Sequence, residues 1–177
     1  MQMNSKNLLS IKNKLKKYLK DKDILDIILF GSFVKGKAVP NDIDIAIISN
    51  KKIIIEDSNF HVSLISLKDF FVDVPSIIHT LFREGYSLKN NKSFSEIYKF
   101  KNKVLFKYDF SGLIASEKVK IVNILRGKGK EKGSVESESG EWLANQVFFI
   151  PVEKEELFDK FFRNFKVKYK KFYLLMH

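Results

Sequence analysis

The stretches LFGS (29–32) and DIDI (42–45) decide the fold of this 177-residue chain, and the second begins ten residues after the end of the first. The short apolar run that leads into the Gly-Ser pair is typical of a buried strand. In the second stretch carboxylates alternate with isoleucines, a period of two that predicts a strand with both aspartates on one face. Neighbouring strands lie about 4.8 Å apart, so we expect these aspartates to lie beside the Gly-Ser pair.

Such an arrangement suits phosphoryl transfer from a nucleotide. Backbone N–H groups hold a triphosphate best where no side chain intervenes, which explains Gly31, and the small hydroxyl of Ser32 lies beside them. Magnesium that bridges phosphates needs hard oxygen ligands. We therefore predict Gly31 and Ser32 as phosphate-binding residues, and Asp42 and Asp44 as catalytic residues that hold Mg²⁺.

Together with Gly36, these residues resemble the signature of the minimal nucleotidyltransferases of archaea and bacteria, in the DNA polymerase β superfamily, over about residues 5–88. The resemblance implies a mixed-sheet core and Mg²⁺-dependent transfer of a nucleoside monophosphate from a nucleoside triphosphate (NTP) to a hydroxyl. With the positive net charge, RNA is a reasonable acceptor. A protein hydroxyl is the other, as in the toxin-neutralising members of the superfamily, and a toxin partner chain would then be expected.

The third carboxylate of the family lies on the next strand, where it completes the metal site and acts as general base. Here the predicted strand 60–66 brings His61 to that position, while earlier registers bring Asn59 or Asp57. His61 is open to three interpretations: a working base, since imidazole titrates near neutral pH; a metal ligand, although imidazole suits magnesium poorly; or a mark of lost catalysis. The last leads to an alternative function, a catalytically degenerate fold that binds RNA or a ribonucleoprotein.

The polar segment 90–94 suggests a division into a nucleotidyltransferase-like domain, 1–92, and a small basic α/β domain, 93–177, which resembles a C-terminal extension of archaeal nucleotidyltransferase-like proteins. The fold class is therefore α/β (α+β). Periodicity predicts the elements of both parts: strands at 24–30, 42–49, 60–66, 104–110, 147–152 and 167–175, and helices at 5–19, 67–71, 75–84, 116–125 and 153–164.

Net charge is +11 and the pI is near 9.6, which favours polyanions, although a lysine-rich composition also follows from an AT-rich genome. Segment 126–140 has almost no apolar content and predicts an exposed, mobile loop. Between the lysines of the C-terminus, apolar residues are expected to be core: Leu157, Phe161, Phe165, Val167, Tyr169 and Phe172. The candidate nucleic-acid-binding residues are Arg126, Lys128 and Lys130 in the loop, and Lys166, Lys168 and Lys170 on one face of the last strand.

Several classes of protein are excluded by composition. The chain has no cysteine, so disulfides and thiolate metal sites are excluded. No apolar run approaches the roughly 20 residues that span a bilayer, so no membrane partner is expected. The N-terminus has no secretory pattern, and a cytoplasmic protein is expected.

Overall fold

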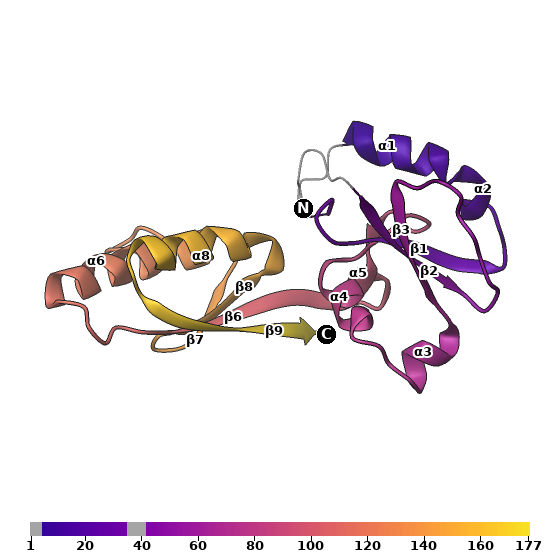
Figure 1. Ribbon diagram of the computed structural model, residues 1–177. Helices are drawn as coiled ribbons and strands as arrows, with labels where there is room; N and C mark the ends of the chain where they lie inside the picture. Colours follow the sequence, from indigo (N-terminus) through magenta and orange to yellow (C-terminus); the bar gives the residue numbers. More distant parts are fainter. Residues whose placement is uncertain (1–4, 35–41) are drawn as a thin grey trace. The chain divides into compact units, whose positions relative to one another are not determined.

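The computed structural model describes residues 5–34 and 42–177, and the chain divides into two compact units, Met1–Phe100 and Lys101–His177 (Figure 1). The sequence-based boundary after residue 92 falls earlier than this division. Strand β5 (Lys92–Ser93) pairs with β4 (Tyr86–Ser87), so the chain stays with the first sheet beyond that point. Gly36 and the residues just before Asp42 lie outside the described residues.

The first unit is a mixed five-stranded sheet with helices, as the sequence predicts. Its strand order is β3-β2-β1-β4-β5; β2 and β3 are parallel and the other pairs antiparallel. The main strands are β1 (Ile24–Leu29), β2 (Ile43–Ser49) and β3 (Phe60–Ile65). The helices are α1 (Ser5–Lys14), α2 (Lys16–Leu19), α3 (Leu67–Phe71), α4 (Ile77–Glu84) and α5 (Phe94–Ile97).

Both faces of this sheet are buried, which explains the continuous apolar runs in its central strands. On β2, Ile45 and Ile47 pack with α1 on one face, while Ala46 and Ile48 pack with α4 and α5 on the other. Ile45, Ala46 and Ile47 have no solvent exposure. The strand that leads away from Asp44 is therefore fixed on both sides.

A buried carboxylate joins β1 to β4. Asp26 is 5% exposed and accepts hydrogen bonds from the Ser87 hydroxyl at 2.7 Å, the Asn90 amide at 3.2 Å and the backbone N–H of Ile27 at 2.8 Å. Each carboxylate oxygen thus has a donor, as a buried charge requires. The short strand β4, which shows no strand pattern of its own, is held by this contact.

The second unit is a four-stranded antiparallel sheet with two helices on one face (Figure 1). Its elements are β6 (Lys101–Asp109), α6 (Ala115–Arg126), α7 (Ser134–Ser137), β7 (Glu141–Ala144), β8 (Val147–Pro151), a 3₁₀ turn (Val152–Lys154), α8 (Glu155–Asn164) and β9 (Lys168–Met176). The strand order β7-β8-β6-β9, with α6 after the first strand and α8 after the third, is the ferredoxin-like βαββαβ arrangement.

Stacked and tilted phenylalanines form the core of the second unit, between the sheet and the helices. Phe106 of β6, Phe148 of β8, and Phe158 and Phe162 of α8 are all at most 1% exposed, and neighbouring rings lie 5.2–6.2 Å apart. These are aromatic packing distances. Four of the 17 phenylalanines of the chain lie in this one cluster.

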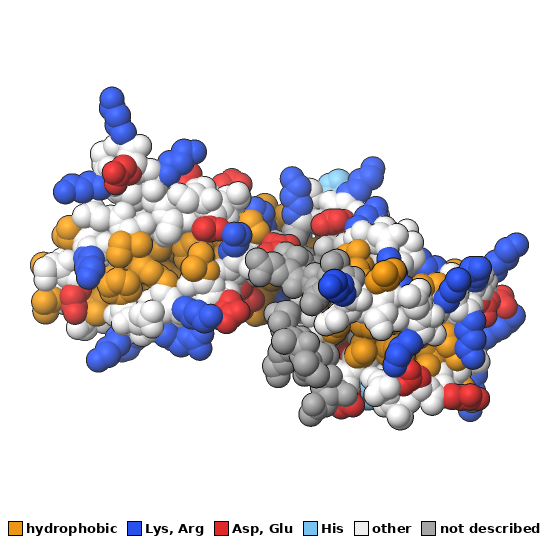
Figure 2. All heavy atoms as spheres, turned by 90° about the horizontal axis from the view of Figure 1, so that it is seen from above, with side chains coloured by type: hydrophobic (Ala, Val, Ile, Leu, Met, Phe, Trp, Pro, Cys, Tyr) orange, Lys and Arg blue, Asp and Glu red, His pale blue; other side chains and the backbone are white. Residues whose placement is uncertain are grey.

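Two residues expected in this core are exposed instead. Leu157 and Phe172 are each 49% exposed. Leu157 lies on the outer side of α8, and Phe172 lies on the sheet face opposite the helices, because its neighbours Lys171 and Tyr173 both bond Glu155 of α8. The helical side of the unit also shows hydrophobic side chains among Lys and Arg (Figure 2).

Segment 126–140 is not a simple mobile loop. It contains α7, and Val135 has no solvent exposure. A Cβ at Gly133 would lie 2.2 Å from the carbonyl oxygen of Leu125, so the chain packs closely against the end of α6. The polar composition does not reveal this structure, because the segment is held by one valine and by backbone contacts rather than by a run of apolar residues.

No helix within residues 5–34 and 42–177 is long and apolar enough to cross a membrane.

Candidate active site

The candidate site lies where β1 ends and β2 begins. The backbone N–H of Phe30 donates to the carbonyl of Asp44 at 3.2 Å, which holds the start of the Gly-Ser pair against β2. Gly31 follows with φ +73°, and a Cβ placed on it would lie only 2.3 Å from Oδ2 of Asp44. Only glycine fits there without displacement, so a backbone segment free of side chains directly contacts the carboxylate.

The two aspartates differ in their surroundings. Asp44 is the second residue of β2, and its side chain is 29% exposed. Asp42 precedes the strand and is exposed. The spacing of two residues directs both toward the same face if the extended backbone continues back to Asp42.

His61 is the residue that β3 brings to Asp44. The parallel pairing of β2 and β3 puts Asp44 and His61 opposite each other, and His61 Nδ1 lies 3.2 Å from Asp44 Oδ1. The imidazole is 73% exposed, so its other nitrogen is accessible. When Nδ1 carries the proton it donates to Asp44, and Nε2 is then the basic nitrogen.

Asp57 and Asn59, the other candidates for the position of the third carboxylate, have different contacts from His61. Asp57 and Asn59 both precede β3, and the Asp57 carboxylate accepts from Lys14 Nζ at 2.9 Å and from the Asn59 side chain at 2.7 Å. The backbone N–H of Asn59, together with Lys14, holds the pKa of Asp57 below its usual value. Asp57 is thus engaged with α1, whereas His61 contacts Asp44.

The donor set at the site is two carboxylates. Among residues 5–34 and 42–177, no group of three or more His, Asp or Glu side chains is close enough to hold a metal ion. The oxygen donors present nevertheless suit a hard cation such as Mg²⁺, which commonly keeps several water ligands. The oxygen chemistry of Asp42 and Asp44 suits magnesium, β3 adds no third carboxylate, and binding of the ion by these two aspartates stays a prediction.

The predicted nucleic-acid residues fall in two separate places in the second unit. Arg126 lies with its guanidinium 3.8 Å from the centre of the Trp142 ring, so it packs α6 onto β7. Lys128 and Lys130 follow α6 and are exposed. Lys166 is exposed with φ +53°, and Lys168 and Lys170 are exposed on β9.

Sequence analysis placed Lys168 and Lys170 on one face of the last strand but missed the apolar residues that share this face of the second sheet. Leu105, Phe149 and Phe172 occupy one row across β8, β6 and β9, because Leu105 pairs in register with both phenylalanines. The sequence signal of this face was the two-residue alternation along β6, which directs its odd-numbered residues to the side of the sheet opposite the core residues Val104 and Phe106. Periodicity alone does not say whether that second face is covered.

Comparison with known proteins agrees with the geometry at the end of β1 and the start of β2. The family model described as polymerase beta, nucleotidyltransferase, matches residues 13–109, more than half of the chain. No curated protein and no solved structure matches the chain. With the Gly-Ser pair beside Asp44 and a mixed sheet around it, the chain belongs to the polymerase β nucleotidyltransferase family.

Proposed function

We propose that the protein is a magnesium-dependent nucleotidyltransferase that moves a nucleoside monophosphate from an NTP to a hydroxyl of RNA or of a protein. The observation that carries this proposal is the contact of Gly31 with Asp44, where a Cβ would lie 2.3 Å from Oδ2. In such a reaction, backbone N–H groups and a metal ion must contact the same phosphate chain. A stretch of backbone without side chains next to a carboxylate allows both contacts. Family membership supports the same reaction.

In this reaction the residues have distinct roles. Gly31 and Ser32 bind the phosphates, and Asp42 and Asp44 hold the magnesium ion. When bound, the ion neutralises charge that develops on the phosphate oxygens. The acceptor oxygen bonds to the α-phosphorus, and the bond from that phosphorus to the bridging oxygen breaks and releases pyrophosphate. His61 Nε2 takes the hydroxyl proton, while Nδ1–H donates to Asp44 and orients the ring.

The test is transfer of label from each of four α-³²P-labelled NTPs, with Mg²⁺, to total cellular RNA or to total cellular protein. We expect transfer by the wild type and none by Asp42→Asn/Asp44→Asn. Asp57→Asn is the matched control, because Asp57 contacts Lys14 rather than the site. Equal transfer by the wild type and the double variant would show that the activity does not come from these aspartates.

A second function, binding without catalysis, is favoured by one observation: histidine, not a carboxylate, pairs with Asp44 on β3. In that case the fold binds RNA or a ribonucleoprotein, and Asp42 and Asp44 do not affect the affinity. Substitution at His61 separates the two functions. If His61 is the base, His61→Ala lowers the rate of transfer by about 10²–10⁴-fold. If catalysis has been lost, the wild type transfers nothing, and only His61→Asp, which restores a carboxylate, can gain activity.

A further inference from the structure

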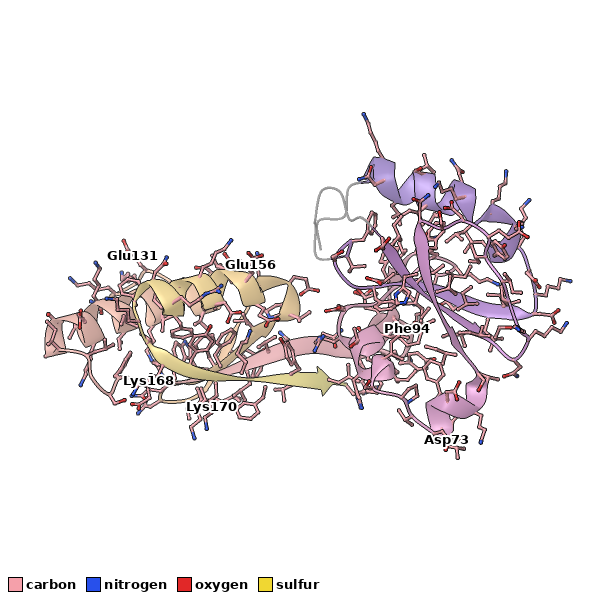
Figure 3. All side chains as sticks on the ribbon, in the orientation of Figure 1. Asp73, Phe94, Glu131, Glu156, Lys168 and Lys170 are labelled. Atoms are coloured by element: carbon pink, nitrogen blue, oxygen red, sulfur yellow. The ribbon has the colours of Figure 1, made fainter. Side chains whose placement is uncertain are left out.

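The sheet of the second unit has one face under α6 and α8 and one face that no helix of this unit covers. Residues of β6 alternate between the faces: Val104 and Phe106 point to the helices and are fully buried, whereas Lys103, Leu105 and Lys107 point the other way. Figure 3 shows Lys168 and Lys170 of β9 on the side of the sheet away from the helices, and Glu156 on the helical side.

An apolar row crosses the middle of this open face. It consists of Phe149 on β8, Leu105 on β6 and Phe172 on β9, which are paired in register. Phe149 is 5% exposed, and the ammonium of Lys103 lies 5.3 Å from the centre of its ring. Phe172 is 49% exposed. The row therefore presents one accessible aromatic ring at the edge of an apolar strip.

Lysines surround the row. Lys107 and Lys170 pair in register on one side of it, Lys103 lies on the other, and Lys168 follows one step further along β9. Within the described part of the chain, Lys103, Lys107 and Lys170 form no ion pair. Two acids share the face or its border, Asp109 opposite Lys168 and Glu141 opposite Phe149. Positive charge still dominates around the row.

Protection of an exposed sheet edge is the ordinary explanation for lysines on an outer strand. It applies to Lys168 and Lys170, because β9 is at the edge of the sheet. It does not apply to Lys103 and Lys107, because β6 has a partner strand on each side. Nor does it explain a half-exposed phenylalanine between them. An aromatic ring among cations instead matches the two chemical groups of a nucleic acid, bases and phosphates.

We propose that this open face binds single-stranded RNA, with a base stacked on Phe172 and phosphates bound by Lys103, Lys107 and Lys170. An open four-stranded sheet stacks unpaired bases on its aromatic side chains, which a duplex cannot offer. The face belongs to the second unit and the Gly31–Asp44 site to the first, and none of the residues that bind RNA takes part in the proposed transfer reaction.

The test is fluorescence anisotropy of a labelled, unstructured ten-nucleotide RNA with the full chain, without NTP or magnesium. Phe172→Leu keeps apolar contact with Leu105 but removes the aromatic ring, and we expect it to weaken binding about ten-fold, as loss of one stacked base does. Phe172→Tyr keeps the ring and should bind like the wild type. Far-UV circular dichroism and the thermal midpoint of each variant check that the fold is retained.

Charge is tested with matched pairs of lysines. Lys107→Ala/Lys170→Ala should reduce the slope of log affinity against log salt by about 1.4, which is roughly 0.7 for each phosphate contact. Lys16→Ala/Lys20→Ala removes the same charge from exposed lysines at α2 in the first unit and should leave the affinity nearly unchanged. Equal losses from both pairs, no effect of Phe172→Leu, or equal affinity for duplex RNA or single-stranded DNA would each overturn the proposal.

Discussion

Gly31 holds φ +73°, a conformation that L side chains rarely adopt, and it faces the carboxylate of Asp44. Two separate costs follow from adding a methyl group at this position. One is the left-handed backbone, about 1–2 kcal/mol. The other is the collision with Oδ2 at 2.3 Å, which can be relieved only if Asp44 or the turn moves. The second cost bears on function, because it displaces a predicted metal ligand.

Gly31→Ala is therefore expected to lower stability by more than the backbone term alone and to weaken magnesium-dependent NTP binding by more than about ten-fold, as loss of 1.4 kcal/mol would. Gly129→Ala is the matched control, because Gly129 has φ +65° and no atom within 4 Å of the added Cβ. Urea unfolding and NTP titration measure both variants. Equal loss of stability, with NTP binding intact in both, would mean that the contact with Asp44 is unimportant.

At the scale of elements, one lysine links β9 to α8. Lys171 donates to Asp159 at 2.7 Å and to Glu155, and its side chain is 25% exposed. Partial burial lowers the pKa of Lys171, but the bonds to the two carboxylates outweigh it and raise the pKa well above the usual value. Because the folded state holds the proton more tightly, this stabilisation is complete below the unfolded pKa of about 10.4 and is lost as the pH rises above it.

We expect Lys171→Met to cost about 1–3 kcal/mol at neutral pH, since it removes the ammonium group from which both Asp159 and Glu155 accept hydrogen bonds. Lys170→Met, at the neighbouring position on the opposite face, should cost little. Unfolding in urea between pH 7 and pH 12 tests the sign of the pH effect: the gap between wild type and Lys171→Met should narrow above about pH 10.4. A gap that stays constant across this range would contradict the assigned role of the ammonium group.

Strands with an apolar or alternating residue pattern could be predicted from the sequence. Strands that form only by pairing with a neighbouring strand could not. The strands β1, β2, β3, β6, β8 and β9 were all predicted near their observed positions, because each is an apolar or alternating run. Tyr86–Ser87, Lys92–Ser93 and Glu141–Ala144 are short and partly polar, and they become strands only through pairing. At the site, the resemblance to the family brought His61 to the position of the third carboxylate, with Asn59 and Asp57 as alternatives, and the structure pairs His61 with Asp44. Metal binding by Asp42 and Asp44 stays a prediction.

At the scale of the whole molecule, the hydrophobic clusters keep to one unit each. The two clusters of the first unit contain buried residues no later than Phe94, and the cluster of the second begins at Val104. A substitution in one core should therefore change the stability of its own unit alone. Ile47 of β2 and Ile150 of β8 provide a matched pair, because both are isoleucines on central strands with no solvent exposure.

Ile47→Ala and Ile150→Ala should each cost their own unit about 2–5 kcal/mol, the usual range for truncating a buried isoleucine. Differential scanning calorimetry should then show two transitions, of which Ile47→Ala lowers the midpoint of one and Ile150→Ala the midpoint of the other. The two transitions are assigned by following binding of the ten-nucleotide RNA through the same temperature range. Binding should be lost in the transition whose midpoint Ile150→Ala lowers. A single transition that both variants shift equally would mean that the units unfold together. The RNA face would then depend on the stability of the nucleotidyltransferase core.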